Sequence, residues 1–191
     1  MIICGVDEAG RGPLAGPVCA AAVILGDKFP GSTLLNDSKK LTAGKREELR
    51  HLICADALAW GLGWASHEEI DSINILQASL LAMKRAFEDM LKKYDFLSGE
   101  NISVIVDGTQ IPDIKNAASC KAMVKADAQV TEVMAASILA KTARDNYMDE
   151  MALKYPQYNY DKHKGYPTKA HREIIRKYGP SPIQRLSFKA V

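Results

Sequence analysis

Two apolar runs of the sequence, IICGV at residues 2–6 and ISVIV at residues 102–106, each end directly before an aspartate. Short runs rich in β-branched residues are typical of buried strands, and such strands lie in sheets that helices cover on both faces. The chain is therefore expected to form a layered sheet that carries Asp7 and Asp107 at the carboxyl ends of two of its strands.

The other periodicities supply the rest of an α/β fold. They predict further strands at residues 17–25, 57–65 and 120–127, and helices at about 42–55, 75–94, 130–152 and 168–178. Strands followed by helix, strand and helix favour a mixed sheet flanked by helices, with a C-terminal helical part. At 191 residues the chain is expected to bury one main core. We expect a catalytic domain over residues 1–155 and a basic extension over 156–191 packed on the same domain.

A third predicted strand also ends in an acid, Asp127, and Glu8 follows Asp7 directly. These acids converge if the first and fourth strands are parallel neighbours, because ligands gather at the carboxyl ends of strands. A cluster of carboxylates tolerates ionisation only beside cations, and all-oxygen ligands favour Mg²⁺ or Mn²⁺ over zinc. Two such ions, about 4 Å apart, suit in-line attack on a phosphodiester. Taken singly, each aspartate also fits an ordinary turn residue.

The tail of the chain is strongly basic. Residues 154–191 contain nine Lys and Arg against two acids, and five of the seven tyrosines lie there. Interleaved cations and aromatic rings suit phosphates and stacked sugars or bases, and a solvated basic face fits this composition equally well. The longest apolar run, residues 18–25, is too short to span a membrane, and no secretory signal opens the chain, so we expect a cytoplasmic protein.

The glycines of GRGPLAG, residues 10–16, approximate a dinucleotide-binding loop. In that fingerprint the glycines open a helix whose N-terminus receives pyrophosphate. Here Pro13 follows the second glycine, the next element is a predicted strand, and two carboxylates directly upstream would repel phosphates. The dinucleotide interpretation is therefore rejected.

Seven blocks of the sequence together resemble ribonuclease HII, the type 2 ribonuclease H. They are DEAGRGPLAGPV at 7–18, NDSKKLT at 36–42, VDG at 106–108, KAD at 125–127, AASILAKTARD at 135–145, HKGYPT at 163–168 and RLSF at 185–188. The resemblance implies a ribonuclease H-like fold with a mixed five-stranded sheet. It also implies a metal-dependent endonuclease that hydrolyses the RNA strand of RNA:DNA hybrids and cuts 5′ of single ribonucleotides in duplex DNA, leaving a 3′-hydroxyl and a 5′-phosphate.

The same resemblance assigns roles to individual residues. Asp7, Glu8, Asp107 and Asp127 are the expected catalytic and metal-binding acids, with two Mg²⁺ or Mn²⁺ ions during catalysis. Gly10, Arg11 and Gly12 match a loop that senses the ribonucleotide, whose 2′-hydroxyl separates RNA from DNA. Tyr166 matches a tyrosine that stacks on the deoxyribose after the ribonucleotide. Six cations are expected near the nucleic-acid backbone or the acids, namely Lys39, Lys40, Lys121, Lys125, Lys141 and Arg144, and of these Lys39 and Arg144 are assigned to substrate binding.

Two alternatives stay open on the sequence. A type 3 ribonuclease H shares the fold but usually carries an extra N-terminal domain, for which there is no room before Asp7. A non-catalytic hybrid-binding module would keep the basic tail but would gain nothing from four acids. The expected partners are RNA:DNA hybrid and DNA duplex containing ribonucleotides, with no membrane contact. We expect a monomer that works in ribonucleotide excision and primer removal.

Overall fold

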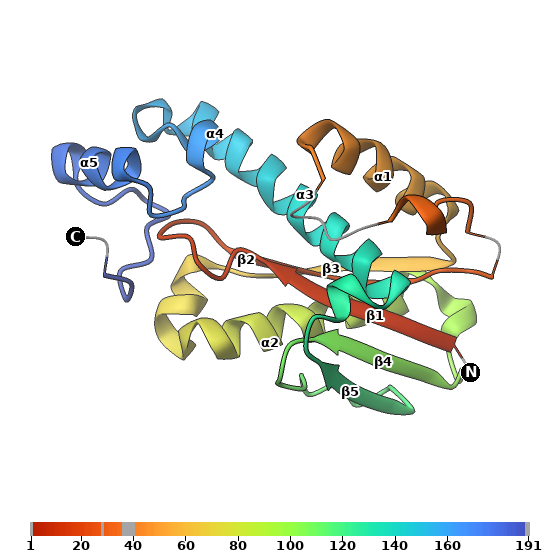
Figure 1. Cartoon of the computed structure of the whole chain (residues 1–191). Coiled ribbons are helices and arrows are strands. Elements are labelled where there is room, and N and C mark those ends of the chain that lie inside the picture. Colours follow the sequence, from red (N-terminus) through yellow and green to blue (C-terminus); the bar gives the residue numbers. More distant parts are fainter. Residues whose placement is uncertain (1, 28, 36–40, 190–191) are drawn as a thin grey trace.

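A computed structural model describes residues 2–27, 29–35 and 41–189 of the chain. Its centre is one mixed sheet in the order β3-β2-β1-β4-β5 (Figure 1). The strands are β1 (Ile2–Ala9), β2 (Val18–Ile24), β3 (Ala59–Ala65), β4 (Ile102–Asp107) and β5 (Ser119–Met123). β1 pairs antiparallel with β2 and parallel with β4. The predicted fold class, a mixed five-stranded sheet with flanking helices, is confirmed.

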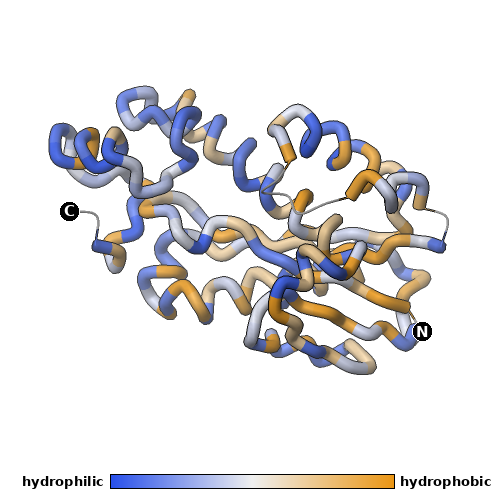
Figure 2. The backbone as a smooth tube through the Cα atoms, viewed as in Figure 1, coloured by the Kyte–Doolittle hydropathy of each residue, from blue (hydrophilic) through white to orange (hydrophobic). Residues whose placement is uncertain are grey.

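Helices cover both faces of the sheet, α2 on one side and α1 with α3 on the other (Figure 1). The helices are α1 (Ala43–Asp56), α2 (His67–Lys93), α3 (Thr131–Lys154), α4 (Tyr160–His163) and α5 (Lys169–Tyr178). Every residue of β2 is buried, with Ala20 and Ala22 in the core beneath α2 and Ala21 and Val23 in the core beneath α1 and α3. This double burial explains why β2 reads as a continuous apolar run rather than an alternating one, and Figure 2 shows hydrophobic residues along the strands.

The strand ends predicted from the sequence are wrong for β1 and β5. β1 runs on to Ala9 because Asp7, Glu8 and Ala9 pair with β2, beyond the last residue that pairs with β4. β5 ends at Met123, and Asp127 lies in the 3₁₀ turn Ala126–Ala128 rather than at a strand end. Lys125, with a φ of 59°, adopts the left-handed conformation that ends the extended chain there.

α2 begins at the capping box formed by Ser66 and Glu69, a pattern that the sequence shows ahead of the apolar periodicity at residues 75–94. Its helical path is interrupted at Asn74, whose φ is 68° and ψ 163°. The Asn74 side-chain oxygen accepts a hydrogen bond from the N–H of Gln77 at 3.1 Å, so the residue caps the second segment, which is the long amphipathic helix expected from the sequence.

Two contacts hold α3 and the C-terminal part against the sheet. A Cβ on Gly5 of β1 would lie 2.2 Å from the backbone of Glu132, so only glycine lets the start of α3 come this close. Beyond α3, a small core joins Tyr158, Tyr160 and Ile183 to Ala15 and Met148. The boundary at residue 155 stays a prediction. Among the described residues, no helix is both long and apolar enough to cross a membrane.

Candidate active site

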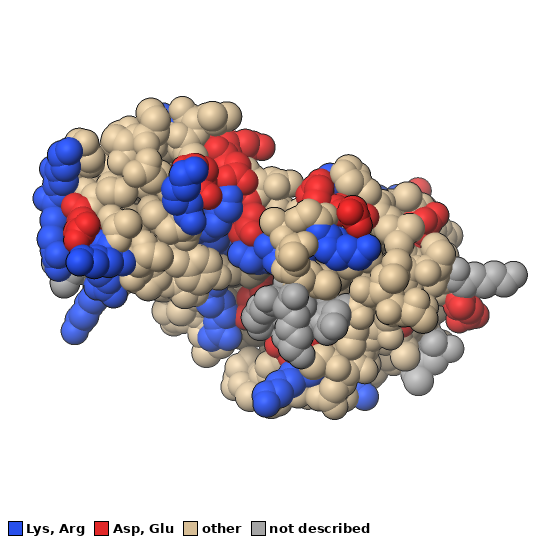
Figure 3. All heavy atoms as spheres, turned by 45° about the horizontal axis from the view of Figure 1, so that its top comes forward, with Lys and Arg blue, Asp and Glu red and all other residues tan. Residues whose placement is uncertain are grey.

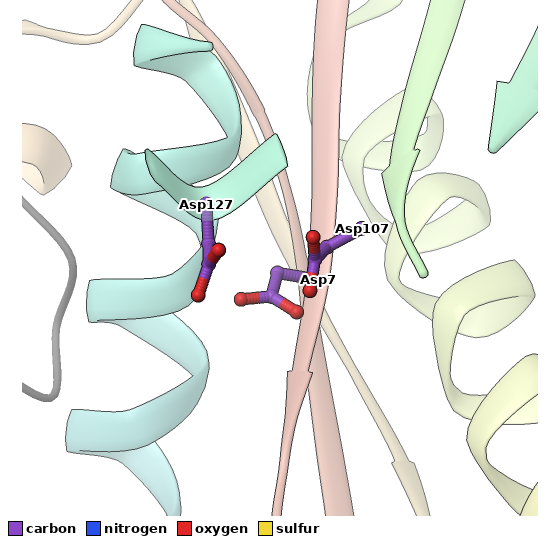
Figure 4. Close-up of side chains that lie close together, drawn as sticks. All are labelled: Asp7, Asp107 and Asp127. Carbon is purple, nitrogen blue, oxygen red and sulfur yellow. The ribbon is translucent and has the colours of Figure 1, made fainter. Parts of the chain in front are cut away.

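The parallel pairing of β1 with β4 brings two of the predicted acids together. Val6 is level with Val106, so the next residues along, Asp7 and Asp107, leave the ladder side by side. Asp127 approaches from the turn before α3 (Figure 4). One carboxylate oxygen from each of the three residues lies within 4.8 Å of the others, and Asp7 and Asp127 are buried. The acids therefore converge, as expected for parallel neighbours.

Main-chain donors fix the positions of these carboxylates. The N–H of Glu8 donates to Asp7 Oδ1 at 2.8 Å, and the N–H of Ala126 donates to Asp107 Oδ1 at 2.7 Å. The second bond ties the end of β4 to the turn that carries Asp127. The side chain of Ser137, on α3, also forms a hydrogen bond with the Asp7 carboxyl. The cluster is thus held by three separate elements.

Burial and mutual repulsion raise the pKa values of two acids of the site, Asp7 and Glu8, and so favour their protonated forms. The pKa of Asp7 is well above its ordinary value because the carboxyl is desolvated and because Glu8 and Asp107 lie nearby. Burial also raises the pKa of Glu8, against the opposing charge of Arg11. The protein alone resists full ionisation of this cluster. An all-oxygen set that is crowded, buried and short of positive charge fits a divalent cation such as Mg²⁺ or Mn²⁺.

Glu8 stands apart from the three aspartates. It is not one of the residues whose oxygens meet within 4.8 Å. Its Oε1 lies 3.5 Å from Nη1 of Arg11, and its side chain is 12% exposed. Its metal-binding role stays a prediction.

Asp7 and Glu8 line a cavity of about 240 Å³ that the predicted sensing loop also lines. The lining residues are Asp7, Glu8, Ala9, Gly10, Arg11, Gly12, Ser137, Lys141 and Tyr166. Ser137 and Lys141, one turn apart on α3, place a hydroxyl and an ammonium in it, and Lys141 Nζ binds Asp145 at 2.7 Å. Sequence reasoning missed Ser137, although it stands four residues before Lys141 in the block AASILAKTARD.

Tyr166 also lines the cavity. Its side chain is 38% exposed, and Lys141 Nζ lies 5.7 Å from the ring centroid. The backbone on both sides of the ring is fixed, since the Tyr166 N–H donates to the carbonyl of His163 at 2.8 Å and the Tyr166 carbonyl lies 3.0 Å from Nδ1 of His171. The ring is therefore held at the rim, where a sugar could stack on it.

Arg144 lies beside residues of this cavity, with its guanidinium carbon 5.9 Å from the Tyr166 ring centroid, and its predicted role near the nucleic acid stays a prediction. The side chain is 1% exposed, and its nitrogens donate to the carbonyls of Pro17, Ala15 and Lys164 at 3.0–3.1 Å. A guanidinium engaged in this way does not face the cavity. Its packing explains Gly10, which has a φ of +102° and on which a Cβ would lie 2.1 Å from Arg144 Nε. Lys39, the other cation assigned to substrate binding, lies outside the described residues, as does Lys40.

Sequence reasoning also missed Arg185, which is fully buried and donates to the carbonyls of Gly10, Arg11, Gly16 and Pro17. Outside the cavity, the positive charge of the tail gathers on α5, at the left end of the molecule in Figure 3. The α5 cations are Lys169, Arg172, Arg176 and Lys177.

Comparisons with known proteins agree on one family. The profile described as Ribonuclease HII matches residues 4–191. A ribonuclease HII of Treponema denticola is 60% identical over 98% of both chains. The crystal structure of ribonuclease H2 from Pyrococcus horikoshii superposes with a TM-score of 0.73 at 26% identity, covering 100% of this chain and 95% of that one. Bst-RNase HIII in complex with Mn²⁺ shares the fold, with a TM-score of 0.75 at 17% identity over 100% of this chain and 68% of that one.

Proposed function

The chain belongs to the ribonuclease HII family, and from this membership we propose how its residues recognise and cut a ribonucleotide. The protein is a type 2 ribonuclease H, an endonuclease. The comparisons do not favour the two alternatives, a type 3 enzyme or a hybrid-binding module without activity. The substrates proposed for it are RNA:DNA hybrid and duplex DNA that contains single ribonucleotides, cut on the 5′ side of the ribonucleotide.

The observation that carries this proposal is the convergence of Asp7, Asp107 and Asp127, in which Asp7 also lines the cavity of the Gly10–Gly12 loop. We assign the three aspartates as the residues that hold Mg²⁺ or Mn²⁺, with Glu8 at the edge of the site. The raised pKa of Asp7 and the all-oxygen donor set support this assignment. When bound, divalent ions supply the positive charge that activates water and stabilises the departing oxygen.

The chain's own residues place the nucleotide. Gly10 and Gly12 bring the main chain close to the 2′-hydroxyl, and Arg11, whose side chain is 51% exposed, reaches toward a phosphate. Lys141 contributes an ammonium to the same cavity. Tyr166 offers its ring to the deoxyribose that follows the ribonucleotide. Because the loop adjoins Asp7 directly, the sugar that is read and the phosphate that is cut belong to the same nucleotide.

The reaction is a hydrolysis. Water adds its oxygen to phosphorus, the bond from phosphorus to the 3′-oxygen breaks, and that oxygen leaves as a 3′-hydroxyl. The 5′-phosphate stays on the ribonucleotide. From this chemistry we propose a role in removing misincorporated ribonucleotides and RNA primers in the cytoplasm. We also propose that the protein is a monomer, which size-exclusion chromatography tests.

The test uses a labelled DNA duplex with one ribonucleotide and an all-DNA duplex of the same sequence. Each is incubated with the protein and Mg²⁺ or Mn²⁺, or with chelator. We expect one cut, 5′ of the ribonucleotide, only with metal and only in the first duplex. No cleavage with metal, or equal cleavage of the all-DNA duplex, would refute the proposal.

A further inference from the structure

Arg185 grips both arms of the loop that joins β1 to β2. Its Nε donates to the carbonyl of Gly16 at 2.8 Å, and Nη1 donates to that of Arg11 at 3.0 Å. Nη2 donates to the carbonyls of Gly10 at 2.6 Å and Pro17 at 3.2 Å. One guanidinium therefore satisfies four carbonyls from the start and the end of the loop.

This grip fixes which way the loop peptides face. In a trans peptide the C=O and the N–H point in opposite directions, and the chain has no cis bond among its described residues. Because the carbonyls of Gly10 and Arg11 point inward to Arg185, the N–H groups of Arg11 and Gly12 point the other way. Neither N–H has a hydrogen-bond acceptor among the described residues, and both residues line the cavity beside Asp7. Two successive free N–H groups can receive an oxygen.

The position of Arg185 is itself anchored. Its own N–H donates to the carbonyl of Leu14 at 2.8 Å, and its guanidinium carbon lies 5.1 Å from the Phe188 ring centroid. Asp71, on α2, accepts hydrogen bonds from the N–H groups of Leu186 at 2.8 Å and Ser187 at 2.9 Å. The segment after Arg185 is thus tied to α2, independently of the loop.

Arg185 is buried without a carboxylate partner among the residues that the structure describes. Within the part of the chain that the structure describes, neither Arg185 nor Arg144 forms an ion pair, and both are at most 1% exposed. Burying two guanidiniums without counter-ions is costly, and a packed apolar side chain would avoid that cost. Among the described residues, the two guanidiniums donate hydrogen bonds only to main-chain carbonyls. Such bonds orient the loop to which the carbonyls belong.

We infer that Arg185 is a positioning residue for ribonucleotide recognition, an assignment that rests on the proposed reading of the sugar by this loop. It turns the Gly10 and Arg11 carbonyls inward, so that the Arg11 and Gly12 N–H groups face the 2′-hydroxyl and the adjacent phosphate. It touches neither substrate nor metal and acts only through the loop.

The experiment compares Arg185→Met, Arg185→Lys and the wild-type protein. Hydrogen exchange of the peptide covering residues 10–17 is measured without substrate. Turnover of the single-ribonucleotide duplex is measured in Mn²⁺ and corrected for folded fraction. Ile175→Ala is the matched control, because Ile175 is 8% exposed on α5 and makes no hydrogen bond to the loop. Asp71→Asn weakens the hydrogen bonds that Asp71 accepts from the N–H groups of Leu186 and Ser187. This variant replaces Arg185→Met in the comparison if Arg185→Met does not fold.

We expect Arg185→Met to speed exchange over residues 10–17 by about tenfold, with exchange in α1 unchanged. Its kcat should fall roughly 10- to 100-fold because the loop is displaced. Affinity for the all-DNA duplex and the rise of Tm in Mn²⁺ should stay as in wild type, and Arg185→Lys should recover part of the loss. Asp71→Asn should change the same two quantities to a smaller extent.

Unchanged exchange over residues 10–17, or a kcat deficit no larger than that of Ile175→Ala, would overturn the assignment. If the wild-type protein itself cuts nothing, the proposed function fails, and the exchange data still decide whether Arg185 sets the loop.

Discussion

Replacing Asp107 by asparagine isolates the charge of the acid cluster. Asparagine keeps an oxygen that can accept the Ala126 N–H, now 2.7 Å from Asp107 Oδ1, but it carries no charge. Two unit charges 4.8 Å apart, the span of the three-aspartate cluster, repel by about 3 kcal/mol at an effective dielectric of about 20. Losing the charge from the hydrogen bond costs about 1 kcal/mol. The metal-free variant should therefore be more stable by about 2 kcal/mol.

For a chain of 191 residues, that difference corresponds to a Tm increase of about 4–8 °C. The assay is thermal unfolding in chelator at about pH 9, where ordinary carboxylates are fully ionised, repeated with excess Mn²⁺. At a concentration about 100 times its Kd, a metal stabilises wild type by about 2.7 kcal/mol, and Asp107→Asn should lose most of that gain together with cleavage.

Asp113→Asn is the control for this measurement, because the Asp113 side chain is 69% exposed and forms an ion pair with Lys84 at 3.5 Å. Its effect should stay within about 0.5 kcal/mol. A lower Tm of Asp107→Asn in chelator would show that the carboxylates do not repel one another. An undiminished Tm rise in Mn²⁺ would show that they do not share a cation.

The remaining predictions concern pH, the loop and the rim. Because folding raises the pKa of Asp7 and Glu8, the metal-free protein should lose stability as pH rises through those raised pKa values. Over the same pH rise, calorimetry should show tighter Mn²⁺ binding, and a pH-independent affinity would contradict this prediction. Gly10→Ala should destabilise by more than 1 kcal/mol in urea melts, whereas Gly44→Ala, with open space around its Cβ in α1, should be neutral or stabilising. Tyr166→Ala should erode the preference for RNA-to-DNA junctions while Tyr166→Phe keeps it; equal losses on hybrid and junction substrates would exclude stacking.

The convergence of Asp7 and Asp107 could be predicted from the sequence because it depends on local rules. Apolar β-branched runs form buried strands, parallel neighbours end at the same edge, and the residue after each run is therefore brought to one place. Asp127 reached the same place by a different route. The run before it has the pattern of a strand, but the left-handed Lys125 ends the extended chain, and a 3₁₀ turn carries the carboxylate into the cluster.

The two buried arginines could not be placed in the same way. Arg144 stands in a long helix and Arg185 in a basic tail, where an arginine usually meets solvent or phosphate. Whether a guanidinium instead donates hydrogen bonds to main-chain carbonyls depends on a loop that is distant in the sequence. Arg144 is 127 residues from Pro17, and Arg185 is 175 residues from Gly10. No periodicity or composition within either segment records that contact.

We propose that Asp7, Asp107 and Asp127 together hold a divalent ion beside the ribonucleotide-sensing loop. The most direct test is anomalous diffraction from crystals of this protein grown with Mn²⁺ and an uncleavable duplex that carries one ribonucleotide. We predict an anomalous peak about 2.0–2.4 Å from oxygens of these aspartates, next to the phosphate on the 5′ side of the ribonucleotide. A cleavage-competent protein whose Mn²⁺ peak lies elsewhere, with the three carboxylates free of metal, would contradict the claim.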